Sequence, residues 1–288
     1  MGANVFSDVV CELGEGPAYD PDSETLFWFD INGKKLLAKK WPNGETVVHE
    51  LPVMASAIAV IDGGRQLIAT ETGLHIRDAR TGTLTLHKEM ETDLPGNRSN
   101  DSRVHPSGAF WIGTMPKDES INSGAFYWYF KGEMKTLYTG VKVPNSICFS
   151  PDGRVAYFID TETKSLKRVD VDPSNGFPTG APKEFVRGGS DGWIDGSVCD
   201  ADGVVWNAKW GGSRVDAYSP DGTLIKSVPV PAVQSSCPAF LGPNASRMAV
   251  TSAWKGMNAT QRAADPEGGK TFLLDIVVKG RFEPKVAL

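Results

Sequence analysis

The sequence lacks the long apolar segments that membrane-spanning helices need. No run of 18 apolar residues occurs among its 288 residues, so we expect no helical membrane span. The first ten residues contain neither a basic flank nor an apolar stretch, so we expect no secretory signal peptide. These absences predict a cytoplasmic protein.

Excess positive charge and paired cysteines are also missing. The 30 Lys and Arg against 35 Asp and Glu give a formal net charge of −5, which disfavours nucleic acid or an anionic membrane as a partner. None of the four cysteines belongs to a CxxC pair, which disfavours a zinc knuckle. Without an export signal we expect reduced thiols, and Cys148 and Cys199 stand in apolar stretches typical of small buried residues.

Helical periodicity is scarce, whereas tight turns are abundant. The best helical candidate is the short segment 258–265, and no segment keeps an apolar period of 3.6 residues with caps. A turn of the Pro-Asp-x-Gly type, followed by a short aromatic or β-branched run, instead recurs along the chain. The six copies span residues 20–30, 61–70, 105–114, 150–160, 200–209 and 242–252.

The spacing of these copies predicts the architecture. Successive turns are separated by 40, 45, 45, 50 and 42 residues, and a period of this size is typical of four-stranded propeller blades. Further strand candidates lie between the copies, at 83–88, 164–171, 214–219 and 223–230. We predict an all-β fold, a single six-bladed β-propeller with four-stranded antiparallel blades over residues 1–288. A β-sandwich or two small β-domains is the alternative, which the even spacing disfavours.

Polar residues recur just before four of the six turns. They are Glu15, then Arg98 with Asn100 and Asp101, then Asn145, and finally Asp195. Because these residues occupy the same position in each repeat, we expect their side chains to converge on the propeller axis. The alternative is that each caps a local turn, as Asp and Asn often do.

Three of these residues form an oxygen-only set with two negative charges. The carboxylates of Glu15 and Asp195 repel each other when buried unless a cation lies between them. Together with the amide of Asn145 they suit a hard divalent ion, with Ca²⁺ preferred and Mg²⁺, Mn²⁺, Zn²⁺ or Fe²⁺ also accommodated.

The segments 13–31, 97–115, 143–161, 195–215 and 242–253 resemble the SMP-30/gluconolactonase family, also called the regucalcin family. The resemblance covers roughly residues 8 to 278. It implies a six-bladed propeller that holds one divalent cation, and bacterial members that hydrolyse sugar lactones.

The resemblance also implies roles for individual residues. Glu15, Asn145 and Asp195 are implied as the metal ligands. Arg98 and Asn100 are implied as substrate-binding residues. Asp118 in the segment GTMPKDE stands near the family's acidic substrate-contact position, where Glu119 is the competing assignment.

The sequence departs from the family's usual pattern at two serines. Ser102 and Ser146 stand where many members carry glycine, and we expect both to narrow the mouth of the site and to affect the choice of substrate. Trp193, Trp210 and Trp254 are in loops that flank the predicted ligands, whereas the other tryptophans are expected to pack between blades.

We therefore predict a metal-dependent lactonase that opens an aldonolactone to its aldonic acid in carbohydrate catabolism, with Asp195 accepting the proton of the attacking water. The expected partner is a small sugar lactone, and the expected assembly is a monomer or a small homo-oligomer. Arg103, Lys117 and Lys209 leave open a lactone that carries an acidic group. The alternatives are a propeller hydrolase for phosphotriesters or organophosphates, a non-enzymatic calcium-binding regulator, and a protein-interaction scaffold.

Overall fold

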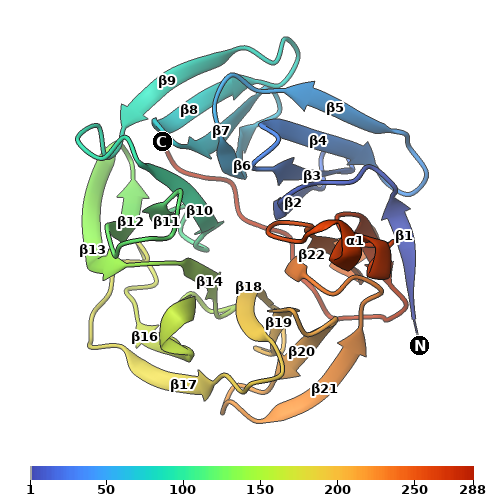
Figure 1. Cartoon of the computed structure of the whole chain (residues 1–288). Coiled ribbons are helices and arrows are strands. Elements are labelled where there is room, and N and C mark those ends of the chain that lie inside the picture. Colours follow the sequence, from blue (N-terminus) through green and yellow to red (C-terminus); the bar gives the residue numbers. More distant parts are fainter. Residues whose placement is uncertain (1) are drawn as a thin grey trace.

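Six four-stranded antiparallel sheets form a ring around a central channel (Figure 1). The computed structural model describes residues 2–288, and Met1 lies outside the described residues. This arrangement confirms the predicted all-β, six-bladed β-propeller.

Five blades consist of four consecutive strands that run from the axis outward. Blade 1 comprises β2 (Gly14–Asp20), β3 (Thr25–Asp30), β4 (Lys35–Lys40) and β5 (Thr46–Glu50), and blade 2 comprises β6 (Ala55–Asp62), β7 (Arg65–Thr70), β8 (Gly73–Asp78) and β9 (Leu84–Glu89). Blade 3 comprises β10 (Asn97–Val104), β11 (Phe110–Pro116), β12 (Gly124–Phe130) and β13 (Glu133–Val141). Blade 4 comprises β14 (Pro144–Phe149), β15 (Val155–Asp160), β16 (Ser165–Asp170) and β17 (Lys183–Arg187), and blade 5 comprises β18 (Trp193–Cys199), β19 (Val205–Trp210), β20 (Arg214–Tyr218) and β21 (Leu224–Pro229).

The sixth blade joins the two ends of the chain. Its inner strands are β22 (Ser235–Leu241), β23 (Arg247–Ser252) and β24 (Thr271–Leu274), and its outer strand is the first of the chain, β1 (Ala3–Ser7). Val5 of β1 is opposite Phe272 of β24 in this antiparallel pair. The ring is therefore closed by strand pairing.

The hydrophobic core lies between the blades. Buried apolar side chains form six clusters, and each cluster joins two neighbouring blades. Trp28 lies between blades 6 and 1, and Trp111 lies between blades 3 and 4, where its ring is edge-on to Phe149. Such burial of large aromatic surfaces is the main stabilising contribution that blade contacts provide. The predicted inter-blade role of these tryptophans is confirmed.

Little helix is present. The helix α1 (Ala259–Ala264) begins at Asn258, whose side chain accepts a hydrogen bond from Gln261 N, and it confirms the short candidate at 258–265. The other helical turns are η1 (Thr161–Thr163) and η2 (Pro243–Ala245). Among residues 2–288, no helix has the length and apolar character that crossing a membrane requires. All four cysteines are buried and free.

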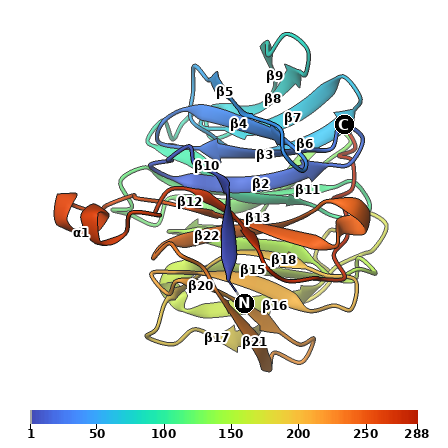
Figure 2. The same cartoon turned by 90° about the vertical axis from the view of Figure 1, so that its right-hand side faces the viewer.

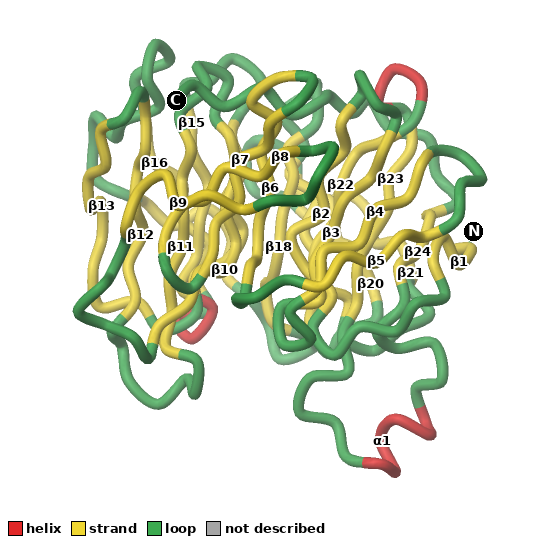
Figure 3. The backbone as a smooth tube through the Cα atoms, turned by 90° about the horizontal axis from the view of Figure 1, so that it is seen from above, coloured by secondary structure: helices red, strands yellow, loops and turns green. Residues whose placement is uncertain are grey.

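The two faces of the ring are covered differently. On one face, α1 stands at the end of a protruding loop (Figure 3). The C-terminal tail, residues 275–288, crosses the opposite face (Figure 2). Its backbone is bound to several blades: Val286 N donates to Val60 O at 2.8 Å, and Ala201 N donates to Lys279 O at 2.8 Å. The tail therefore closes one end of the channel, and the α1 face remains the accessible end.

Candidate active site

A shared irregularity in the innermost strands aims the predicted residues at the axis. Every innermost strand shifts register at the same level, between Glu15 and Ala18, Ala55 and Ala57, Ser99 and Ser102, Asn145 and Cys148, Ile194 and Ser197, and Ser235 and Pro238. Glu15 and Asn145 begin such bulges, and Asn100 and Asp195 lie within them. Because a β-bulge turns its side chain away from the ladder, four blades present a polar group to the channel.

The strands approach so closely here that a Cβ atom would clash at two glycines beside the predicted ligands. Gly16 has a φ of +55°, and a Cβ atom there would lie 1.9 Å from Ser56 O. A Cβ atom on Gly196 would lie 2.4 Å from Cys237 Sγ. These glycines let the bulges of adjacent blades touch, which holds Glu15 and Asp195 at the centre.

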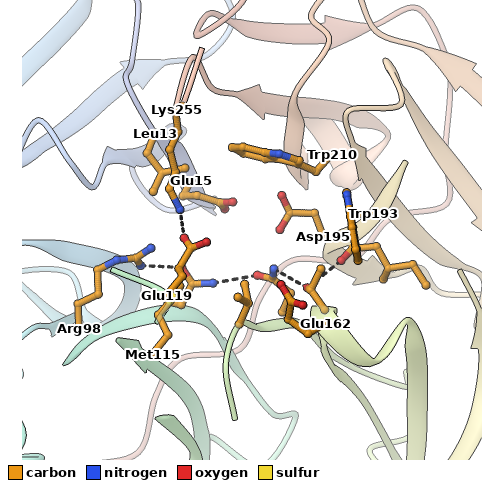
Figure 4. A pocket seen from close by; sticks show the side chains of 16 residues that line it. Leu13, Glu15, Arg98, Met115, Glu119, Glu162, Trp193, Asp195, Trp210 and Lys255 are labelled. Atoms are coloured by element: carbon orange, nitrogen blue, oxygen red, sulfur yellow. Dashed lines mark hydrogen bonds and ion pairs between the residues drawn. The ribbon is translucent and has the colours of Figure 1, made fainter. Parts of the chain in front are cut away.

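A cavity of about 320 Å³ opens on the α1 face above these bulges (Figure 4). Five of the six predicted site residues line it: Glu15, Arg98, Asn100, Asn145 and Asp195. Figure 4 shows the carboxylates of Glu15 and Asp195 directed into the same space. The structure therefore brings together residues that are up to 180 positions apart in the chain.

The two buried carboxylates destabilise each other's charge. Burial, with a contribution from Asp101, raises the pKa of Glu15 to about 8. Burial and then the neighbouring charges of Glu15 and Asp101 hold the pKa of Asp195 well above its usual range. No Lys, Arg or His side chain within residues 2–288 forms an ion pair with either carboxylate. A divalent ion would offset this repulsion, so the two carboxylates could hold one.

The donor set fits such an ion only when Asn145 is included. Among the described residues, no group of three or more His, Cys, Asp or Glu is arranged to hold a metal. Asn145 Oδ1 accepts a hydrogen bond from Asn100 Nδ2 at 2.9 Å and keeps a second lone pair, while Asn145 Nδ2 donates to Thr161 Oγ1 at 3.0 Å. Two carboxylates and one amide oxygen suit a hard cation such as Ca²⁺ and leave room for further ligands.

Arg98 and Asn100 are linked to this set by hydrogen bonds. Arg98 Nη1 donates to Asn100 Oδ1 at 2.7 Å and to Ser99 O at 2.9 Å, and Asn100 Nδ2 donates to Asn145 Oδ1 and to Pro144 O. The two bonds of Arg98 use one guanidinium nitrogen. The predicted substrate-binding residues therefore also orient the amide of Asn145.

The two serines do not narrow the mouth, so that expectation is wrong. Ser146 is fully buried below the cavity, and its hydroxyl donates to Asp195 O. Ser102 is also buried, and its hydroxyl donates to Asn100 O at 3.1 Å. Neither residue lines the cavity. Both side chains are buried next to the bulges, and their hydroxyls donate to backbone carbonyl groups.

The acidic residue at the cavity wall is Glu119. Asp118 is exposed, and its Oδ1 accepts from Ser120 N at 3.1 Å and from Ser120 Oγ at 2.8 Å, outside the cavity. Glu119 lines the cavity and forms an ion pair with Lys255. The reason is local: the chain turns at Glu119, whose φ is +56°, so adjacent side chains point to opposite sides of the loop.

Two of the three tryptophans noted in the sequence line the cavity. Trp193 and Trp210 stand beside Asp195 (Figure 4). Trp254 instead packs under Arg262, and its Nε1 donates to Asp265 O at 3.1 Å. The site thus combines a polar floor with an aromatic wall.

Sequence reasoning missed three polar residues of the cavity, namely Thr161, Glu162 and Lys255. Thr161 and Glu162 follow the predicted strand of the fourth repeat, and Lys255 follows that of the sixth. Polar residues just after each predicted strand could therefore have indicated this part of the cavity.

The three cationic side chains that suggested an acidic substrate form ion pairs outside the cavity. Arg103 forms an ion pair with Glu283, Lys117 with Glu71 at 2.6 Å, and Lys209 with Asp216 at 3.8 Å. None of the three lines the cavity. They therefore lend no support to a lactone that carries an extra negative group.

Comparison with known proteins finds relatives named as lactonases and a solved structure with the same fold. A Rhizobium meliloti (strain 1021) protein whose name places it among sugar lactone lactonases is 50% identical, with 100% of this chain and 98% of that protein covered. The L-arabinolactonase of Azospirillum brasilense is 34% identical, with 94% and 91% covered. The crystal structure of a calcium-binding protein, regucalcin, from Agrobacterium tumefaciens str. C58 superposes with a TM-score of 0.98 at 49% identity, covering 100% of this chain and 98% of that chain.

A family model assigns most of the chain. The model described as the SMP-30/gluconolactonase/LRE-like region matches residues 13–254, which include five blades and two of the four strands of the sixth, together with all of the residues that line the cavity up to Trp210. The chain belongs to the SMP-30/gluconolactonase/LRE-like family.

Proposed function

We propose that the protein hydrolyses a sugar lactone to the open-chain aldonic acid, with a divalent cation held by Glu15, Asn145 and Asp195. The observation that carries the proposal is the convergence of two unpaired, buried carboxylates in a cavity of about 320 Å³. The names of relatives as lactonases support it. When bound, the cation supplies Lewis acidity toward a carbonyl oxygen and lowers the pKa of water.

Asp195 is the proposed proton acceptor. Its carboxylate lies in the cavity and is bound to no other side chain, so it can take the proton of a water molecule that attacks the lactone carbonyl carbon. The ring C–O bond then breaks, and Asp195 returns the proton to the leaving ring oxygen. The product carries one new carboxyl group and one new hydroxyl group, and Asp195 ends as it began.

The remaining cavity residues bind and orient the sugar. Arg98 and Asn100 present N–H donors toward ring hydroxyls or the carbonyl, and Glu119 accepts hydrogen bonds from hydroxyls. Trp193 and Trp210 offer aromatic faces against which the apolar face of a sugar ring stacks. We therefore assign the acidic substrate contact to Glu119 and not to Asp118.

The charge of the cavity favours a neutral lactone. Four carboxylates face two cationic side chains, and these six residues are Glu15, Arg98, Glu119, Glu162, Asp195 and Lys255. One divalent cation would bring this set to neutrality. An additional acidic group on the substrate would then make the filled cavity net negative.

The test is hydrolysis of a panel of five- and six-membered aldonolactones, neutral and acidic, with a phosphotriester included. Exhaustive chelation should abolish turnover, and Ca²⁺, Mg²⁺, Mn²⁺ or Zn²⁺ added back singly should restore it. Glu119→Gln should lower kcat/KM, whereas the matched variant of its neighbour, Asp118→Asn, should not. Full activity in demonstrably metal-free protein, or phosphotriester turnover without lactone turnover, would reject the proposal.

A further inference from the structure

One ion pair spans the mouth of the cavity. Lys255 lies in the loop that follows β23 of blade 6, and Glu119 lies in the loop that follows β11 of blade 3. Blades 3 and 6 are opposite each other in the six-membered ring (Figure 1). Both residues line the cavity, and Figure 4 shows the ammonium and the carboxylate meeting beside Glu15. The pair therefore lies on the path along which a ligand meets the proposed ligands of the cation.

The backbone around Lys255 is firmly held. Its carbonyl accepts from Gln234 Nε2 at 3.1 Å, the preceding N–H of Trp254 donates to Glu12 O at 3.1 Å, and Met257 N donates to Trp254 O at 3.0 Å. The side chain is 31% exposed and has Glu119 as its ion-pair partner. A fixed backbone thus carries a long side chain whose charged end can exchange partners within the cavity.

Hydrolysis changes the charge that the cavity must accommodate. A neutral ester becomes a carboxylate, in a space that already contains four carboxylates. Arg98, one of the two cationic side chains, is buried and has one nitrogen committed to Ser99 and Asn100. Lys255 is the other, and its ammonium is close enough to Asp195 to act against the rise that burial causes in the pKa of that carboxyl group.

We propose that Lys255 is the carboxylate-binding residue of this cavity. Its ammonium leaves Glu119 when a sugar hydroxyl hydrogen-bonds to Glu119, and it then binds the carboxylate that ring opening creates. The inference rests on the proposed lactonase function. Glu119 and Lys255 thereby act as a pair. When their ion pair opens, Glu119 can bind a sugar hydroxyl and Lys255 can bind the new carboxylate.

The experiment compares Lys255→Met with the parent protein loaded with Ca²⁺. Loss of one charge-assisted hydrogen bond should weaken inhibition by gluconate, the open-chain product of gluconolactone, by tenfold to about a hundredfold. The KM for the neutral lactone should change much less than the inhibition constant for gluconate, because the lactone carries no carboxylate. Lys255→Arg should restore most of the gluconate affinity.

The matched control is Lys117→Met. Lys117 also forms an interloop ion pair, with Glu71 at 2.6 Å, and it is similarly exposed at 33%, but it does not line the cavity. Gluconate should inhibit this variant as strongly as it inhibits the parent, and the variant should hydrolyse the lactone at the parent's rate. Circular dichroism and a thermal melt of each variant establish that the comparison is made between folded proteins.

Calorimetric titration with gluconate separates the two proposals. If the parent turns over lactones and Lys255→Met binds gluconate within twofold of the parent, the role of Lys255 is wrong and the lactonase function stands. If the parent hydrolyses no lactone, the proposed function is wrong, and a tenfold weaker binding of gluconate by Lys255→Met still identifies Lys255 as the carboxylate-binding residue. Equal loss of gluconate binding in Lys117→Met would overturn the inference, because removal of a positive charge outside the cavity would then have the same effect.

Discussion

The two ends of the central channel are built from the same strands and differ in the size of their cavities and in the pairing of their buried charges. The end on the α1 face opens into a cavity of about 320 Å³ and contains Glu15 and Asp195 without ion-pair partners among the described residues. The other end contains a cavity of about 30 Å³ under the C-terminal tail. There Arg103 is buried and its guanidinium is paired with Glu283 of the tail.

The difference arises from the segments that connect or follow the repeated strands. The blades supply six equivalent bulges, whereas the loop at 117–123, the loop at 254–268 and the tail at 275–288 decide which end is open. Asp101 lies between the ends, close enough to both for its charge to act on Glu15 and Asp195 and to be acted on by Arg103. We expect changes at the open end to affect turnover and changes at the closed end to affect stability.

The largest effect should come from Asp195→Asn at the open end. The variant removes the proposed proton acceptor and one charge of the proposed cation site, and loss of a general base typically lowers the rate by about 10²–10⁴-fold. Stability of the chelated protein should not fall, because one of two repelling buried charges is removed. Steady-state kinetics and urea unfolding measure both quantities. Turnover within a few-fold of the parent, with normal metal binding, would show that Asp195 is neither ligand nor base.

Glu283→Gln should show the reverse behaviour at the closed end. Arg103 would keep its buried charge and lose its direct partner, which should lower the free energy of unfolding by about 3 kcal/mol, the lower end for a broken buried pair because Asp101 remains nearby. The value of kcat/KM should stay within about threefold. The control is Lys285→Met, whose exposed pair with Asp22 should contribute less than about 0.5 kcal/mol. Equal stabilities of the two variants in urea would mean that the tail does not stabilise the closed end.

Gly196→Ala should lower both the stability and the turnover of the protein, unlike the variants at either end. The new methyl group would contact Cys237 Sγ between blades 5 and 6 and should cost about 1–3 kcal/mol, as overpacking of a core typically does. Because Asp195 is the preceding residue, kcat/KM should fall as well. Urea unfolding and lactone kinetics on one preparation test this coupling. A loss of stability with full turnover would show that the bulge tolerates the shift and that Asp195 is held by other contacts.

The last expected effect depends on pH and concerns the residue between the ends. Burial raises the pKa of Asp101 to about 6, with Arg103 acting in the opposite sense, so the folded state binds its proton more tightly than the unfolded state with its ordinary value of 3.8. The contribution of Asp101 to stability is therefore present below pH 3.8 and is lost as the pH rises to about 6. In chelated protein, the stability of Asp101→Asn relative to the parent should increase across this interval and level off above it. Parallel pH profiles of urea unfolding for the two proteins would contradict the assignment.

The sequence was sufficient for the blades because their determinants are local. Turn residues such as those at 151–153, followed by β-branched and aromatic runs, specify a hairpin within about a dozen positions, and their even spacing predicted six blades. The polar positions before the turns were phased by the same repeat, which is why Glu15, Asn145 and Asp195 were found to line one cavity.

The remaining features depend on contacts between distant parts of the chain. Lys255 faces Glu119 across 136 positions, and Arg103 meets Glu283 across 180. Nothing near either residue in the sequence indicates these pairs. Ser146 illustrates the same limit: its place after Asn145 suggested a role at the mouth, but its buried side chain donates to Asp195 O of the next blade.

The pairing of β1 with β24 delays completion of the sixth blade during synthesis of the chain. About 260 residues separate the two strands, so at about 5–20 residues per second the first strand waits roughly 10–50 s on the ribosome for its partner. Until then Val5 and its neighbours form an unpaired edge, and the sixth blade does not exist. Among the described residues, blade 6 is thus the one blade that combines strands from opposite ends of the sequence, and without Thr271–Leu274 the strand β1 has no partner.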